Sequence, residues 1–213
     1  MSDAEVEAAS LAALDGAPAS PQLLRFYAAL ARAGTNQQAF NAANQAAGQV
    51  QGEPQSHARV LLAALRDLPQ AEIGPAVTET ANARAAAMRG AVRDALIADI
   101  GQLPVNAQSL VALANAPQSM RQQFAGALDA EDFAAIDRAV AERRGAVGAE
   151  AERQLIAEIA AVPGDESAFV AIDRAAEERA LRLLPDQNAA RVREAASAQR
   201  KKTADALFGP FQQ

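Results

Sequence analysis

The sequence of 213 residues contains no cysteine, no tryptophan and only one histidine. Without cysteine there can be no disulfide, thiolate nucleophile or thiolate metal ligand. One histidine, His57, cannot supply a multi-histidine metal site or the repeated Glu-x-x-His pairs of di-metal bundles. A Walker-type phosphate loop and the glycine pattern of dinucleotide-binding folds are also missing. We therefore expect neither a metal nor another cofactor, and we interpret His57 as a surface residue near a helix start.

Charge and hydropathy argue against two further classes of protein. The net charge is −6, whereas binding to nucleic acid needs clustered lysine and arginine. No apolar run approaches the length of a membrane span, and the acidic start Met1 to Glu7 is unlike the basic start of a secretory signal. We therefore expect a cytoplasmic protein that does not bind nucleic acid; a leader removed from the chain is the alternative.

Alanine dominates what is present. It makes up roughly a quarter of the residues and is the strongest helix former, while aromatic residues account for only 4%. An alanine buries little area, so the stability of the fold should depend on a few large side chains between closely spaced helices. These expected anchors are Phe26, Phe40, Leu96, Phe124, Phe133, Leu155 and Phe169.

Helical periodicity runs through the chain, and no segment alternates polar and β-branched residues long enough to predict a strand. The sequence predicts an all-α fold of about seven to nine helices, arranged as an irregular helical repeat that is either solenoid-like or a multi-helix bundle. The expected helices cover about 21–33, a stretch around Phe40 to Gly48, 54–68, 75–103, 107–116, 117–128, a long segment from Asp129 to Pro163 that Gly145 and Gly148 bend or split, a segment from Asp165 to before Pro185, and 187–207.

An internal repeat supports the helical-repeat interpretation. Residues 91–116 resemble residues 150–175, because Leu96 to Pro104 and Leu155 to Pro163 share one pattern of apolar positions. Val111 and Val170 follow these prolines at the same separation, which places the two copies 59 residues apart. Equal spacing favours duplication; the alternative is that alanine-rich helices resemble one another by composition alone. The tetratricopeptide pattern is absent.

The sequence predicts three segments. Residues 1–19 carry acidic but no basic residues and end in Gly16-Ala17-Pro18-Ala19, which predicts a flexible acidic lead-in. Residues 20–208 form the helical domain, and 209–213 form a C-terminal tail. Charged residues at helical spacing over 132–144 and 173–179 predict solvated helix faces.

One short motif suggests an activity. Glu166-Ser167-Ala168-Phe169 resembles the Glu-Ser dipeptide at the catalytic acid of lytic transglycosylases. That resemblance implies an alternative function, a helical cell-wall-acting enzyme or accessory factor that uses Glu166. This chain continues with Val170-Ala171-Ile172, where that family has Gly-Leu-Met-Gln. A helix start explains the same residues, with acidic side chains at the N-terminus and Phe169 in the core.

The last helix differs from the others. It carries Arg200 and the only two lysines, Lys201 and Lys202, and it ends in Phe208 and Phe211 around a Gly-Pro turn. A basic helix with exposed aromatics suits capture by an acidic partner. The alternative is that the cations complement the helix C-terminus and the phenylalanines fold back onto the chain.

Taken together, these features favour a non-catalytic interaction or scaffold protein over an enzyme. The expected partner is another protein, and a second copy of the chain is one candidate. Binding would use a groove between alanine-lined helices, or the C-terminal helix and tail, with Arg200, Lys201, Lys202, Phe208 and Phe211 as candidate contact residues.

Overall fold

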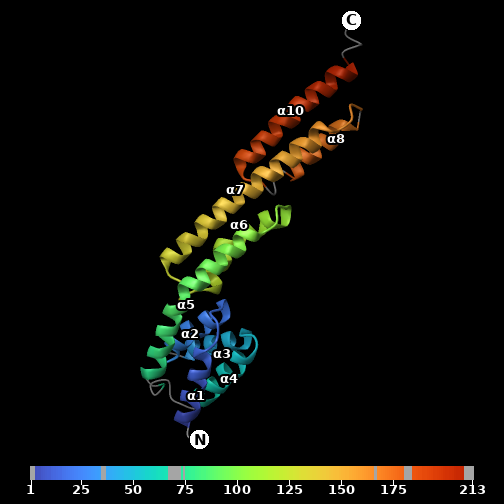
Figure 1. Cartoon of the computed structure of the whole chain (residues 1–213). Coiled ribbons are helices and arrows are strands. Elements are labelled where there is room, and N and C mark those ends of the chain that lie inside the picture. The colour runs from blue at the N-terminus through green and yellow to red at the C-terminus, as the bar shows by residue number, and fades with distance from the viewer. Residues whose placement is uncertain are drawn as a thin grey trace. The chain divides into compact units, whose positions relative to one another are not determined.

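A computed structural model describes residues 3–34, 37–66, 73, 75–165, 167–179 and 184–208, without the side chains of residues 3, 4, 107 and 178. Over these ranges the chain forms nine α-helices, one π-helix and no strand (Figure 1). The predicted all-α class and helix number are therefore confirmed. The helices are α1 (Asp3–Asp15), α2 (Pro21–Ala33), α3 (Gln37–Gln49), α4 (Glu53–Leu65), α5 (Pro75–Gln102), α6 (Ala107–Gln123), α7 (Ala130–Ala160), α8 (Ala168–Asp173), the π-helix η2 (Arg174–Arg179) and α10 (Asp186–Phe208).

The helices divide into two compact units. The first comprises Met1–Ala98 and Met120–Ile136, and the second comprises Asp99–Ser119 and Asp137–Gln213. The division falls inside α5, α6 and α7, so each of these helices contributes to both units. The stretch 20–208, expected to be one helical domain, thus belongs to two units.

The core of the first unit is built around α2, which packs against α3. The Ser20 side chain accepts a hydrogen bond from the Leu23 amide at 3.2 Å, and Pro21 occupies the first helical turn. Phe26 and Tyr27 are buried side by side, with ring centroids 5.6 Å apart. The other predicted anchors Phe40, Leu96, Phe124 and Leu155 are also buried, whereas Phe133 and Phe169 are half-buried.

The N-terminal segment differs from its prediction. Residues 3–15, expected to be flexible, form α1, and Leu14 is buried within the first unit. Asp15 forms an ion pair with Arg84 at 2.5 Å. Acidic residues near the start of a helix interact favourably with its dipole, so the acidic composition of this segment favours a helix rather than a solvated chain.

Charge patterning was also misleading at Asp132. We expected it on a solvated helix face, but its side chain is buried and pairs with Arg89 at 3.3 Å and Arg93 at 3.4 Å. Its carboxylate also accepts a hydrogen bond from the Asp129 amide, while the Asp129 carboxylate accepts one from the Asp132 amide. This reciprocal cap fixes the start of α7.

Two expected helix breaks are absent. α6 continues through Pro117, which was predicted to start a separate helix, and α7 continues through Gly145 and Gly148. Gly148 serves close packing, because a Cβ atom there would lie 3.0 Å from Cδ of Pro185. A residue that favours breaking a helix can thus be retained where tertiary contacts need its small size.

The two turns in the repeated segments have equivalent backbone hydrogen bonds, again 59 residues apart. The pairs are Leu103 N to Ile100 O and Val162 N to Ile159 O, both 3.3 Å, and Asn106 N to Pro104 O and Asp165 N to Pro163 O, at 3.1 and 3.0 Å. The side chains of Asn106 and Asp165 then accept amide hydrogen bonds at the start of the next helix. The shared geometry agrees with the repeat pattern; duplication itself stays a prediction.

We predict that Phe26→Ala lowers the free energy of unfolding by about 3–5 kcal/mol, since it removes a fully buried aromatic ring. Phe208→Ala is the matched control, because Phe208 is 53% exposed, and it should change that free energy by less than about 0.5 kcal/mol. Urea unfolding followed by circular dichroism measures both. Equal effects would contradict the assignment of Phe26 as an anchor.

Tyr27 gives a pH prediction. Burial, and to a smaller extent Asp15, raises the pKa of Tyr27 from 10.0 to about 12. The folded state therefore favours the neutral phenol, and this contribution to stability is complete below pH 10 and lost as the pH rises through 12. Tyr27 is the only tyrosine and there is no tryptophan, so phenolate absorbance reports on it alone. Ionisation of the native protein near pH 10 would contradict the prediction.

Candidate functional site

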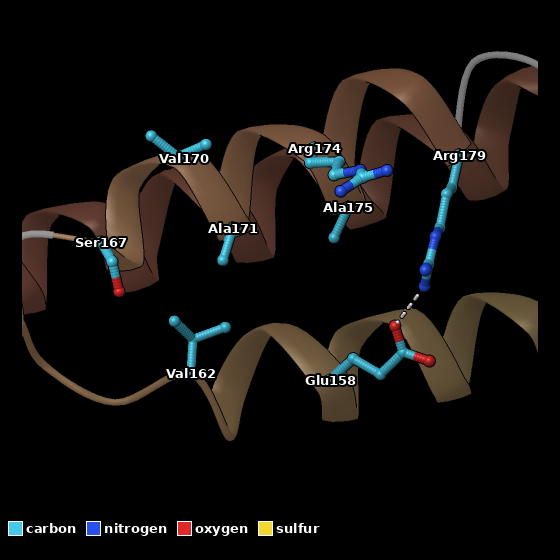
Figure 2. Close-up of a pocket in the computed structure, with 8 residues that line it drawn as sticks. All are labelled: Glu158, Val162, Ser167, Val170, Ala171, Arg174, Ala175 and Arg179. Atoms are coloured by element: carbon cyan, nitrogen blue, oxygen red, sulfur yellow. Dashed lines mark hydrogen bonds and ion pairs between the residues drawn. The ribbon is translucent and has the colours of Figure 1, made fainter.

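A cavity of about 680 Å³ opens in the second unit between the end of α7 and the α8–η2 segment (Figure 2). Its size lies within the range typical of ligand pockets, about 300–1,000 Å³. The lining residues are Glu158, Val162, Ser167, Val170, Ala171, Arg174, Ala175 and Arg179. We call this cavity the α7–α8 groove.

Small side chains create the hollow. Ala171 points from α8 toward Val162, which follows the end of α7, and Ala175 points from η2 toward α7, as Figure 2 shows. Neither alanine is long enough to fill the space between the two backbones. Val170 lies beside the groove with its side chain directed away from α7 (Figure 2), and it is 72% exposed, the largest exposure among the large hydrophobic residues described. The groove therefore presents aliphatic surface to solvent.

The turn between α7 and α8 sets the orientation of α8, which carries Val170. Asp165 accepts hydrogen bonds from the amide of Ser167 at 2.9 Å and from its hydroxyl at 2.5 Å. These hydrogen bonds lower the pKa of Asp165 and hold it as a carboxylate at the start of α8. Ala168 and Ile172 then face the core. Val170, two residues from each, is directed to the opposite face.

The wall of the groove that α8 begins is continued by a π-helix, η2, which follows α8 without interruption. π-Helical turns are rare and occur often at functional sites. Arg174, Ala175 and Arg179 belong to both η2 and the groove lining. The π-helical segment therefore forms part of the cavity wall.

An ion pair closes one end of the groove. Arg179 of η2 contacts Glu158 of α7 at 2.8 Å, and both side chains are 56% exposed. A second cavity of about 260 Å³ also includes this pair in its lining, together with Val105, Leu110 and Leu155 among others. Exposed ion pairs contribute only about 0–1 kcal/mol. The pair can therefore separate at low cost.

The candidate contact residues of the C-terminal helix have different environments. Arg200 of α10 forms an ion pair with Asp173 of α8 at 2.7 Å, so it joins two helices of the same unit. Lys201 and Lys202 are exposed, and Phe208 is half-exposed as the last residue of α10. Phe211 lies outside the described residues. Their role in binding a partner stays a prediction.

α10 is a packed helix despite its weak apolar content. Its buried residues are Asn188, Ala189, Val192, Ala196 and Thr203. Arg191 contacts the Glu152 carboxylate of α7 at 2.8 Å, and Asn188 donates to the same carboxylate at 2.5 Å. Hydrogen bonding to Arg191 holds the pKa of Glu152 below its usual range. α10 is thus tied to both α7 and α8.

Two other residues that the sequence singles out, Glu166 and His57, are not among the residues described as lining the α7–α8 groove. Glu166, the residue behind the enzyme alternative, lies outside the described residues. His57 lies on α4 of the first unit, and its Nε2 is 4.0 Å from Oε1 of Glu53. Within the described ranges no group of three or more His, Cys, Asp or Glu residues is placed to hold a metal ion.

Sequence reasoning did not identify the α7–α8 groove, although one signal was available. Val170 belongs to a repeated motif, and its position two residues from Ile172 places it opposite the buried stripe. A valine on the polar side of a short helix indicates exposed apolar surface. The π-helical turn has no comparable sequence signal.

The α7–α8 groove thus combines aliphatic side chains with one separable ion pair, an arrangement suited to binding. None of the helices in the described part of the chain has the length and apolarity that crossing a membrane requires. Comparisons with protein-family models, with curated proteins and with solved structures give no match for this chain.

Proposed function

We propose that this protein is a non-catalytic scaffold that binds another protein, and that the α7–α8 groove receives an aliphatic segment of the partner. The observation that carries the proposal is the exposed aliphatic side chain of Val170 beside a cavity of about 680 Å³ whose lining also includes Val162, Ala171 and Ala175. Covering such surface releases water from apolar groups, which is the main driving force of association.

Charge at the rim narrows the class of partner. Arg179 lines the groove and is paired there with the exposed carboxylate of Glu158. A partner carboxylate can replace Glu158 as the ligand of Arg179, because the existing pair is exposed and weak. The proposed partner segment therefore carries aliphatic residues next to an aspartate or glutamate.

Site-specific photo-crosslinking tests the proposal with a control from the repeated segment. We predict that benzoylphenylalanine at Ala171, which lines the groove, forms discrete protein adducts in the cells that make this protein. The same substitution at Ala112, the equivalent exposed position 59 residues earlier, should not. Mass spectrometry identifies the adducts.

A second substitution distinguishes binding in the groove from nonspecific association. Val170→Asp should lower the adduct yield at Ala171 about tenfold or more, because it forces an unpaired carboxylate into the apolar contact. Val111→Asp, at the equivalent position, should leave the yield unchanged. Adducts at Ala112 and Ala171 in equal amounts, or no adduct at Ala171, would overturn the proposal.

A further inference from the structure

The first unit contains a cavity of about 180 Å³ between the end of α1 with the segment after it, α2 and the middle of α5. We call it the Tyr27 cavity. Its polar side chains are the carboxylate of Asp15, the guanidinium of Arg84 and the phenol of Tyr27. The rest of the lining is aliphatic and consists of Leu14, Ala17, Ala19, Ala87, Met88 and Ala91. One negative charge, one positive charge and one hydroxyl group therefore share a small, otherwise apolar space.

The hydroxyl of Tyr27 is buried without a hydrogen-bond partner among the described residues. The residue is only 1% exposed, and its ring packs beside Phe26, so the core accounts for the ring. A phenylalanine would make the same ring contacts. Buried polar atoms nearly always have a partner, because an unpaired one costs free energy. The hydroxyl is thus a group that the packing of the core does not explain.

Asp15 and Arg84 bring opposite charges to the same cavity. Nη2 of Arg84 donates to Oδ2 of Asp15 at 2.5 Å, and the two side chains are 42% and 33% exposed. Burial contributes most to the raised pKa of Tyr27, Asp15 raises that pKa further and Arg84 lowers it. The phenol therefore lies within the field of both charges. A partly exposed ion pair contributes little to stability, so this pair can separate to admit a ligand.

We propose that the Tyr27 cavity binds a small zwitterion, an α-amino acid with a short aliphatic side chain. The carboxylate of the ligand accepts hydrogen bonds from Arg84 and from the hydroxyl of Tyr27, while its ammonium group donates to Asp15. Two ion pairs then replace one, and the buried hydroxyl gains an acceptor. A ligand with a single charge would leave either Asp15 or Arg84 without its partner, which favours the zwitterion.

The volume of the cavity limits the side chain of the ligand. At about 180 Å³ it is smaller than sites for drug-sized ligands, which begin at about 300 Å³. Leu14, Met88 and the alanines of the lining offer only apolar contacts, so the side chain should be short and aliphatic, as in alanine. The site lies in the first unit and the α7–α8 groove in the second, so neither proposal depends on the other.

Isothermal titration of the full chain with L-alanine tests the site. Acetate, which has only the carboxylate, and methylammonium, which has only the ammonium group, are the controls at the same ionic strength. We predict saturable binding of L-alanine at one site per chain, about tenfold or more tighter than either control. The ultraviolet absorbance of Tyr27, the only tyrosine in a chain without tryptophan, should shift as its hydroxyl gains an acceptor.

Tyr27→Phe separates a ligand-binding hydroxyl from a structural one, because it removes the hydroxyl and keeps the buried ring. It should weaken L-alanine binding about tenfold, the loss expected for a hydrogen bond to a charged group. Since the hydroxyl has no described partner in the free protein, the urea midpoint should stay the same or rise. A structural hydroxyl would give the reverse, a lower midpoint with unchanged affinity.

A charge-matched pair of variants tests the role of Arg84. Arg84→Gln should weaken L-alanine binding about tenfold or more, whereas Arg59→Gln removes the same charge from an exposed position of α4 and should leave binding unchanged. Circular dichroism of each variant confirms that the helices are retained.

Four results would each overturn the proposal. They are the absence of saturable L-alanine binding, binding of acetate or methylammonium as tight as that of L-alanine, unchanged affinity in Tyr27→Phe, and a loss of affinity in Arg59→Gln as large as that in Arg84→Gln.

Discussion

Close packing of alanine-rich helices around a few large side chains is the interaction on which this structure depends. Alanine contributes helix propensity but little buried area, so cohesion must come from residues such as Phe26 and Leu30. These side chains are not evenly distributed. α2 buries five leucine or aromatic residues within one short helix, which makes it the centre of the first unit.

The α7–α8 groove follows from the same constraint in the second unit. Along α8 and η2 the buried residues are Ala168, Ile172, Ala175 and Ala176, so only one of them is large. Helices joined mainly through alanine leave space between their backbones, and residues of the π-helical turn line the space that is left here. A cavity lined by short aliphatic side chains is the physical result.

Periodicity predicted the helices because an apolar stripe repeats in the same way wherever a helix packs. Periodicity failed where tertiary contacts, rather than the local sequence, determine whether a segment is helical. Acidic composition concealed α1, which Leu14 holds in the core. Gly148, expected with Gly145 to bend or split the helix, instead permits close contact with Pro185. The α7–α8 groove was hidden for another reason. The exposure of Val170 can be inferred from spacing, but the π-helix and its facing wall on α7 bring together segments that the sequence does not connect.

Large side chains are concentrated in α2 and stabilise the first unit, whereas the alanine packing of α8 and η2 leaves that segment adaptable. Native-state hydrogen exchange of the full chain, resolved by mass spectrometry, measures this directly. We expect backbone amides in 21–33 to exchange about a hundredfold more slowly than those in 167–179, because the former open only with the buried cluster around Phe26. Equal exchange in the two segments would contradict it.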